Sequence, residues 1–515
     1  MAYIVEQKVG NHIYLYEAES YWDPVKKQPR QRRKYLGRKD PETGRPRPTQ
    51  RGGWPRASRD FGHVYLLEQL AHRAGLVEVL AAVYGAEAGL LLDLAMYQVA
   101  EAKPLYLFQS WQEGVRGQTA AGSSSPRLSE WVRAWGRRSG EREEFLRQWI
   151  GRSGGVEGVV FDVTSLSSYS RLVDLLEWGY NRDGDGLPQV NVGVVYGQPA
   201  NVPIAYRVWP GSVPDVSTLD LTAELLREYG LAELAFVLDR GFYSAANLER
   251  LAGGGHRFLL PLPLSTRLAR QLLAGHRKAL VSPAQAFRFQ DRAQYHRRVE
   301  TALGGVPLAA HLFFDGRRKA DEEAHLIGRL VDLERRVAER PGRSRVAVAR
   351  TLNEAWRGSR HLYTLSLDQG AVVLRRKPKA ISRLINRMGF VIHLTNDLDR
   401  QRDEVLRLYR RRDRVEKLFD VLKNELIEGR LRVSSREALE GRLFLAFLAL
   451  VLHTLVDNAM RERDVYKQLS VAEVLAELKK LRRIEMSTGR SYLTEITKKQ
   501  RILFEKLNIP IPKDT

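Results

Sequence analysis

Cysteine is absent from the 515-residue sequence. This absence excludes disulfide bonds, thiolate zinc sites and cysteine nucleophiles. Histidine is scarce too, with 11 residues, and no two of them follow the H-x-x-x-H spacing of helical metal sites. Any metal ion must therefore be held by carboxylates or by scattered histidines.

Long apolar runs are also missing. No stretch of 18 or more apolar residues occurs, and LFLAFLALVLHTLV, residues 443–456, is too short to cross a bilayer. The start, MAYIVEQKVG, lacks the basic and then apolar pattern of a signal peptide. No helix pattern with a bulky apolar face suggests a membrane surface either. We therefore expect a soluble, intracellular protein with no membrane partner.

Positive charge is in excess. The chain has 83 lysines and arginines against 61 acidic residues, a formal net charge of +22 and an isoelectric point near 10.0. Such a chain is expected to bind a polyanion, most commonly nucleic acid. Much of the charge is arginine, whose fork suits phosphate better than it serves solubility.

The first 150 residues divide into two regions. Residues 3–20 alternate as strands do, and the basic segment Lys26–Lys39 leads into a linker rich in proline and glycine. Region 1–57 is therefore interpreted as a small β-rich basic region with a linker. Region 58–152 has helical periodicity and is interpreted as a helical DNA-binding domain, so that deleting residues 1–150 is expected to weaken DNA binding far more than folding.

Beyond residue 153 the pattern changes to strands. Short apolar or alternating runs and amphipathic segments follow one another in the order β-β-β-α-β-α-β, with a hairpin between the second and third strands. Ser244 is placed to cap the second helix. We assign region 153–264 to the first part of an α/β domain.

A long segment then interrupts this arrangement. Region 265–387 mixes strand-like pieces with one long charged helix, and we interpret it as a β-rich insertion domain. Region 388–460 holds a further strand, GFVIHLTND, and then helices, and it completes the α/β domain. Region 461–515 is predicted to be helical and basic.

One helix carries an ordered set of polar residues. Tyr409, Arg412, Glu416 and Lys423 are three, four and seven residues apart and share one face of an α-helix. The apolar residues lie mostly one position away, so the polar stripe follows the margin of a buried face. Taken alone, this pattern is also explained by ion pairs within an edge helix.

Two aspartates end apolar runs of the strand type. Asp162 follows VEGVVF and Asp239 follows LAELAFVL, and strand ends project side chains towards a cleft, although such aspartates also cap turns. Together with Glu416 they would repel one another without a cation. Mg²⁺ or Mn²⁺ fits such oxygen ligands, and two ions about 4 Å apart can activate a water or a 3′-hydroxyl at a phosphodiester.

These residues also carry a resemblance to a known family. The helix that carries Tyr409, Arg412, Glu416 and Lys423 contains the complete pattern Y-x2-R-x3-E-x6-K. Asp162 lies in a D-x-T motif, and Asp239 and Arg240 lie in DRGFYS. The sequence resembles the DDE transposases of bacterial insertion sequences, in particular the IS-four-like group, over most of its length from Met1 to about Leu455.

The resemblance implies an α/β architecture in which an RNase H-like catalytic domain is split by the insertion. It implies an endonuclease of DNA transposition that binds terminal inverted repeats, cleaves them and joins the freed ends to target DNA. The catalytic and metal-binding residues would be Asp162, Asp239 and Glu416, which would hold two Mg²⁺ or Mn²⁺ ions. The expected partners are double-stranded DNA and a second copy in a homodimeric synaptic complex, in the nucleoid-associated bacterial cytoplasm.

The resemblance also implies DNA contacts. The residues concerned are Tyr409, Arg412, Lys423 and Arg240, and in the insertion Trp356, which would hold a flipped base. A packed tryptophan is the competing interpretation of Trp356.

Two other functions stay open. The first is an RNase H-like metal-dependent nuclease or resolvase that cleaves without joining. The second is a non-enzymatic DNA-binding descendant of a transposase.

Overall fold

The computed structural model describes most of the chain. The described residues are 2–514, except 11, 42, 48–53, 116, 118, 120–121, 180–183, 185, 340–343, 369–370 and 428. It is a mixed α/β structure built around one large sheet.

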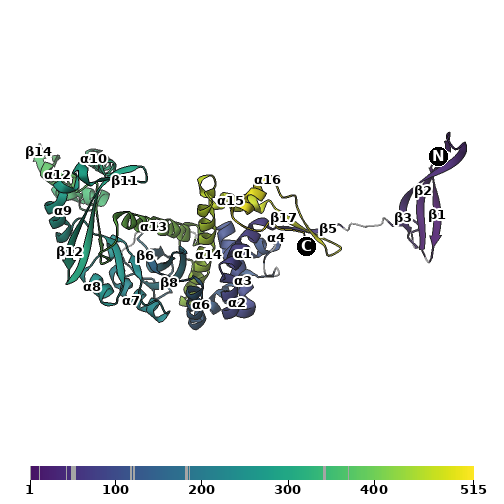
Figure 1. Ribbon diagram of the computed structural model, residues 1–515, viewed down its shortest axis with the longest axis horizontal. Coiled ribbons are helices and arrows are strands. Elements are labelled where there is room, and N and C mark those ends of the chain that lie inside the picture. Colours follow the sequence, from purple (N-terminus) through teal and green to yellow (C-terminus); the bar gives the residue numbers. More distant parts are fainter. Residues whose placement is uncertain are drawn as a thin grey trace.

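A separate four-stranded antiparallel sheet opens the chain. Its strands are β1 (Ala2–Val9), β2 (His12–Asp23), β3 (Gln28–Lys39) and β4 (Pro46–Arg47), in the order β1-β2-β3-β4. Most of the basic segment predicted at Lys26–Lys39 is strand β3, and nearly all of its side chains are exposed. Figure 1 shows this sheet at one end of the molecule, away from the other elements.

Helices make up most of the described part of residues 62–152, as the periodicity predicts. They are α1 (Gly62–Arg73), α2 (Leu76–Tyr84), α3 (Ala88–Glu101), α4 (Phe108–Gly114), α5 (Ser125–Arg137) and α6 (Ser139–Arg152), and the strand β5 (Pro55–Asp60) precedes them. Their buried side chains belong to the same hydrophobic cluster as the central sheet. The expectation that residues 1–150 can be removed with little effect on folding is therefore wrong, because the deletion would expose this shared core.

The central sheet has nine strands in the order β11-β12-β13-β16-β10-β9-β6-β7-β8. Five of them form the predicted β-β-β-α-β-α-β unit: β6 (Gly158–Ser167), β7 (Gln189–Gln198), β8 (Val202–Pro210), β9 (Ala235–Val237) and β10 (Arg257–Pro261), with α7 (Asp215–Glu228) and α8 (Ala245–Gly253) between them. Strands β6, β9 and β10 are parallel, and β7 and β8 are antiparallel to their neighbours. The Ser244 hydroxyl accepts a hydrogen bond from the Asn247 amide and caps α8, which confirms that prediction.

The segment predicted as a β-rich insertion domain contains both strands and helices. Its elements are α9 (Arg267–Leu280), β11 (Ala286–Phe289), β12 (Arg292–Leu303), β13 (Val306–Phe314), α10 (Gly316–Glu339), α11 (Arg345–Ala355), β14 (Tyr363–Asp368), β15 (Ala371–Arg376) and α12 (Pro378–Ile385). Strands β11–β13 extend the central sheet by pairing with β16 (Phe390–Thr395). Only the part from α10 to α12 packs around a hydrophobic cluster of its own.

Two long helices follow β16. Helix α13 (Arg402–Asp420) passes directly into a π-helical turn, η6 (Val421–Leu426), and α14 (Arg436–Glu462) comes after a short connection. Figure 1 shows α14 between the central sheet and helices α1–α3.

Two stretches of the described residues are long and apolar enough to cross a membrane, Leu76–Glu101 and Arg436–Glu462. The apolar run at residues 443–456, which is too short to cross a bilayer, is therefore part of the longer helix α14. In α14, 89% of the most apolar window is buried within the protein, as in a core helix.

The C-terminal region is not wholly helical. It consists of α15 (Val471–Lys479), β17 (Arg482–Met486), β18 (Ser491–Leu493) and α16 (Lys498–Lys506). Strand β17 pairs with β18 and, on its other edge, with β5. This pairing with the start of the helical region explains why a charged segment forms a strand here.

Candidate active site

Asp162 lies within β6, in the middle of the central sheet. The strand continues to Ser167, so the prediction that it ends at Asp162 is wrong: β6 pairs with β7 as far as Ser167, which lies opposite Gln189. Asp162 is 5% exposed, and its Oδ1 accepts a hydrogen bond from the Val163 amide at 2.8 Å.

Asp239 lies beside Asp162 because of the strand register. Strands β6 and β9 are parallel, and Val160 pairs with Val237. Each aspartate comes two residues after its member of this pair, so the chain leaves β9 with Asp239 level with Asp162. The Asp239 side chain is 29% exposed, which makes it the more accessible of the two.

Helix α13 brings the third carboxylate to the same place. It packs against β6, β9 and β10. Arg414 ties its middle to α14 by donating to Asp457 at 3.1 Å. Glu416 lies half a turn further along, with its side chain 52% exposed.

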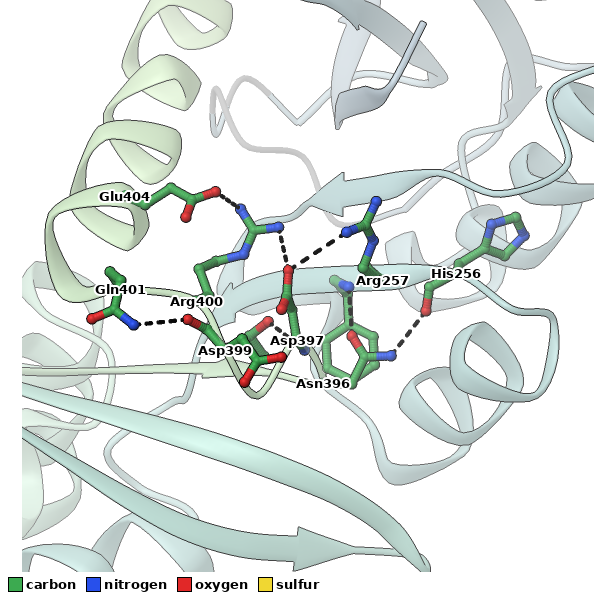
Figure 2. Close-up of polar contacts among 10 residues, drawn as sticks. His256, Arg257, Asn396, Asp397, Asp399, Arg400, Gln401 and Glu404 are labelled. Atoms are coloured by element: carbon green, nitrogen blue, oxygen red, sulfur yellow. Dashed lines mark hydrogen bonds and ion pairs between the residues drawn. The ribbon is translucent and has the colours of Figure 1, made fainter.

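A polar network fixes the start of the segment that leads into α13 (Figure 2). The Asn396 side chain accepts from the Phe258 amide at 2.8 Å and donates to the His256 carbonyl at 2.9 Å, so it holds the end of β16 to the start of β10. Arg400 then joins Asp397 and Glu404, each at 2.8 Å. The direction of α13 is therefore set by bonds to the sheet.

All three carboxylates meet at one guanidinium, that of Arg412. Its Nη2 lies 2.5 Å from Glu416 Oε1 and 3.6 Å from Asp162 Oδ2, and its Nη1 lies 3.5 Å from Asp239 Oδ1. Nη1 also donates to the Tyr409 hydroxyl at 3.2 Å. The structure thus brings Asp162, Asp239 and Glu416 together around a single positive charge.

The electrostatics agree with this geometry. Burial alone would lower the pKa of Arg412, but the charges of Asp239, Tyr409, Asp162 and Glu416 hold that pKa above its ordinary value. Burial raises the pKa of Tyr409. The nearby Arg412 charge lowers this pKa, whereas the charges of Asp239 and Glu416 raise it, and the net shift is upwards. Arg412 therefore stays charged and Tyr409 stays protonated in this state.

The other predicted DNA contacts are more scattered. Arg240 is exposed in the short 3₁₀ turn directly after Asp239. Lys423 lies in the π-helical turn, so the prediction that it shares one face of an α-helix with Tyr409, Arg412 and Glu416 is wrong. A π turn has wider hydrogen-bond spacing than an α turn, so seven residues from Glu416 no longer correspond to two α turns.

Trp356 lies in the insertion and packs against a different hydrophobic cluster from the one that surrounds the carboxylates. Its ring is partly buried against the hydrophobic cluster of α10–α12, and the Arg329 guanidinium lies 4.0 Å from the ring centroid. This packing accounts for Trp356 without a ligand, and its contact with DNA stays a prediction.

Three histidines behind Tyr409 are part of the site's support. His296 Nε2 and His311 Nδ1 are 3.0 Å apart, and the His393 ring lies 4.4 Å from the Tyr409 ring. Burial lowers the pKa of His393 to about 3, so the ring is neutral. The sequence indicates packing for His393, and only the pairing of β12, β13 and β16 shows that the three meet.

The carboxylates suit a hard divalent cation in chemistry but not in their present spacing. Oxygen ligands are those that Mg²⁺ and Mn²⁺ prefer. Within the described ranges, however, no three acidic or histidine side chains stand close enough to hold one ion. The Arg412 guanidinium occupies the point where the carboxylates converge.

Comparisons with known proteins place this site in a family. The family described as "Transposase DDE domain" matches residues 155–452, which include all three carboxylates and the insertion. The chain belongs to this family of transposases, whose members generally use divalent metal ions to break and join DNA strands.

The other comparisons add little. None of the curated proteins matches the sequence. A cryo-EM structure of the piggyBac transposase synaptic complex with hairpin DNA aligns with 81% of this chain and 76% of its own, at 10% identity and a TM-score of 0.33. That likeness is too distant to show a shared fold.

Proposed function

We propose that the protein is the cut-and-paste transposase of a bacterial insertion sequence of the IS-four-like group. It would bind the terminal inverted repeats, cleave the DNA there and join the freed 3′ ends to target DNA. The observation that carries the proposal is the meeting of Asp162, Asp239 and Glu416 at Arg412, inside the region that matches the family.

In this proposal the three carboxylates hold two Mg²⁺ or Mn²⁺ ions. When bound, such ions activate the attacking oxygen and stabilise the leaving oxygen of a phosphodiester. Asp162 and Asp239 are fixed by the sheet, whereas Glu416 is half exposed and comes from a helix. The two aspartates therefore form the rigid side of the site, and Glu416 completes it.

In this proposal Arg412 binds the carboxylates before DNA is bound and a DNA phosphate afterwards. In the state described, it neutralises the carboxylates and keeps them assembled. When DNA is bound, its fork binds a backbone phosphate beside Glu416, together with Tyr409, Lys423 and Arg240. One residue thus serves as counter-ion before cleavage and as phosphate ligand during it.

The strand order supports an RNase H-like catalytic domain. Three antiparallel strands, β8-β7-β6, continue into the parallel strands β9 and β10, with one aspartate on β6 and another directly after β9. The insertion separates this part from β16 and α13, so regions 153–264 and 388–460 form the two halves of the domain.

We base the DNA-binding regions on charge for the N-terminal sheet and on position for the helical region, which has 11 basic and 11 acidic residues. Strand β3 exposes most of its basic side chains, and the helical region 58–152 flanks the catalytic domain. We assign contacts with transposon ends to both, and place the protein as a homodimer in a synaptic complex within the bacterial cytoplasm.

The test is cleavage and strand transfer on DNA that carries the sequences flanking the gene. A transposase nicks these ends in Mg²⁺ and joins pre-cleaved 3′ ends to a second DNA. Cleavage without joining would favour the nuclease or resolvase. DNA binding with neither reaction would favour the non-enzymatic descendant.

A further inference from the structure

A basic pocket of about 240 Å³ lies between the helical region and the catalytic half of the chain. One wall consists of α5 and the short 3₁₀ turn Leu105–Leu107. The other consists of the connection between η6 and α14 and the first turns of α14. The pocket is distinct from the carboxylate site, whose residues do not line it.

Close helix packing holds the two walls at a fixed separation. A Cβ on Gly441 of α14 would lie 1.9 Å from the Val132 carbonyl oxygen of α5. A Cβ on Gly136 of α5 would lie 1.8 Å from the Glu437 carbonyl oxygen of α14. Only glycine allows this approach, so the pocket is a built feature of the α5–α14 contact.

The charge of the pocket is of one sign. Among the described residues that line it, none is acidic and four are arginines: Arg133, Arg430, Arg432 and Arg442. Tyr169 orients one of them, because its ring centroid lies 4.5 Å from the Arg430 guanidinium. Arg442 donates to the Leu426 carbonyl at 3.3 Å, which fixes it to the end of η6. Several arginines around one small space favour an anion that accepts several hydrogen bonds.

Apart from the arginines, the lining combines three serines and Tyr106 with apolar side chains, and the space is small. Leu128 and Val132 of α5 face Ile427 and Val433 across the pocket. The volume is below the roughly 300 Å³ at which pockets for whole small molecules begin. An anionic group with a compact apolar attachment, part of a longer polymer, fits both features.

We propose that this pocket binds one phosphodiester of DNA, with the arginines on the phosphate and the deoxyribose against the apolar wall. The assignment rests on the proposed function, since DNA is the polymer concerned. The pocket lies directly after the π turn that continues the helix of Glu416. A strand held here therefore lies at the segment of the chain that comes next after the helix of the third carboxylate.

The test uses the full-length protein in EDTA and a fluorescein-labelled duplex of about 40 base pairs, titrated at several salt concentrations. The test variant is Arg133→Ala with Arg432→Ala, both on exposed residues of the rim. The matched control is Arg335→Ala with Arg350→Ala, which removes two exposed arginines of the insertion. Single Arg133→Gln and Arg432→Gln variants replace the double variant if its thermal midpoint differs from that of the wild type.

The test variant should bind DNA at least about tenfold more weakly than the control, and the slope of log K against log salt should fall by about 0.9 for each phosphate that the variant no longer binds. Equal affinity and equal slope in the test and control variants would overturn the pocket assignment and leave the proposed function standing. Failure of the wild-type protein to bind the duplex would instead overturn the proposed function.

Discussion

At the scale of single residues, the central finding is the position of Arg412. Its guanidinium contacts three carboxylates that would otherwise repel one another. The sequence predicts the three carboxylates and the stripe of Tyr409, Arg412 and Glu416. The family resemblance implies that Arg412 binds a phosphate. It does not indicate a contact with the aspartates, because spacing along one helix cannot show that two distant strands reach the same guanidinium.

Replacing Arg412 should therefore change metal binding in the absence of DNA. In Arg412→Ala the carboxylates lose their competing cation, so Mn²⁺ should bind on the order of tenfold more tightly in a calorimetric titration. The same variant in chelator should lose roughly 3 kcal/mol of unfolding free energy, because a buried pair is broken. Arg410→Ala, on the same helix, serves as the control. Unchanged Mn²⁺ affinity in Arg412→Ala would show that the guanidinium does not compete with the metal.

The buried histidines make stability depend on pH. Burial lowers the pKa of His393 from 6.5 to about 3, so below pH 6.5 the unfolded chain binds a proton that the folded chain does not. The contribution of neutral His393 to the free energy of unfolding is complete above pH 6.5 and is lost as the pH falls towards 3. Between pH 7.5 and 5.0, His393→Phe should lose about 2 kcal/mol less than the wild type in urea unfolding. Equal losses in the two proteins would contradict the neutral, buried state of His393.

At the scale of elements, α14 is the helix that joins the parts of the protein. It packs against α3 and α5 on one side and against β8 of the sheet on the other. The apolar residues of α14 predict that the helix is buried. They do not predict which elements pack against it, because a helix that is apolar all round has no preferred face. The strands β6–β10 were predictable because each is a short apolar run between turns. Strand β17 was not predictable, because its charged sequence is extended through pairing with β5 and β18.

The closest helix contact predicts a specific loss of stability. In Gly441→Ala the new methyl group would lie 1.9 Å from the Val132 carbonyl oxygen, so α14 and α5 must separate. We expect a loss of roughly 3 kcal/mol in chemical denaturation. Gly328→Ala in α10 is the matched control, because nothing lies within 4 Å of its Cβ and alanine favours the helix. A Gly441→Ala protein as stable as the Gly328→Ala protein would contradict the packing described.

At the scale of the whole molecule, the chain is a catalytic sheet with basic regions on its flanks. Composition predicts both features. The net charge of +22 indicates a polyanionic partner, and the absence of cysteine leaves carboxylates as the expected metal ligands. Composition does not predict where one unit ends. The helical region shares its core with the sheet, and the insertion shares strands with it.

The N-terminal sheet is the part that should be removable. Deleting residues 1–47 leaves the shared core intact and removes the exposed arginines of β3. The deletion should weaken binding to transposon ends and flatten the salt dependence, because the protein then binds fewer phosphates. The thermal midpoint of the remainder should stay within a few degrees of that of the full chain. Unchanged affinity and salt slope would exclude this sheet from DNA binding.

The most direct test of the central claim is metal-dependent cleavage by carboxylate variants on DNA carrying the flanking sequences. Glu416→Gln keeps shape and hydrogen bonding but removes the charge. Its control is Glu404→Gln, because Glu404 lies on the same helix and pairs with Arg400, just before that helix, at the same i, i+4 spacing as Glu416 with Arg412. Glu416→Gln, Asp162→Asn and Asp239→Asn should each lower cleavage by several orders of magnitude while DNA binding persists, and double variants should be hardly worse. Near wild-type cleavage by Glu416→Gln, equal to that of Glu404→Gln, would contradict the account.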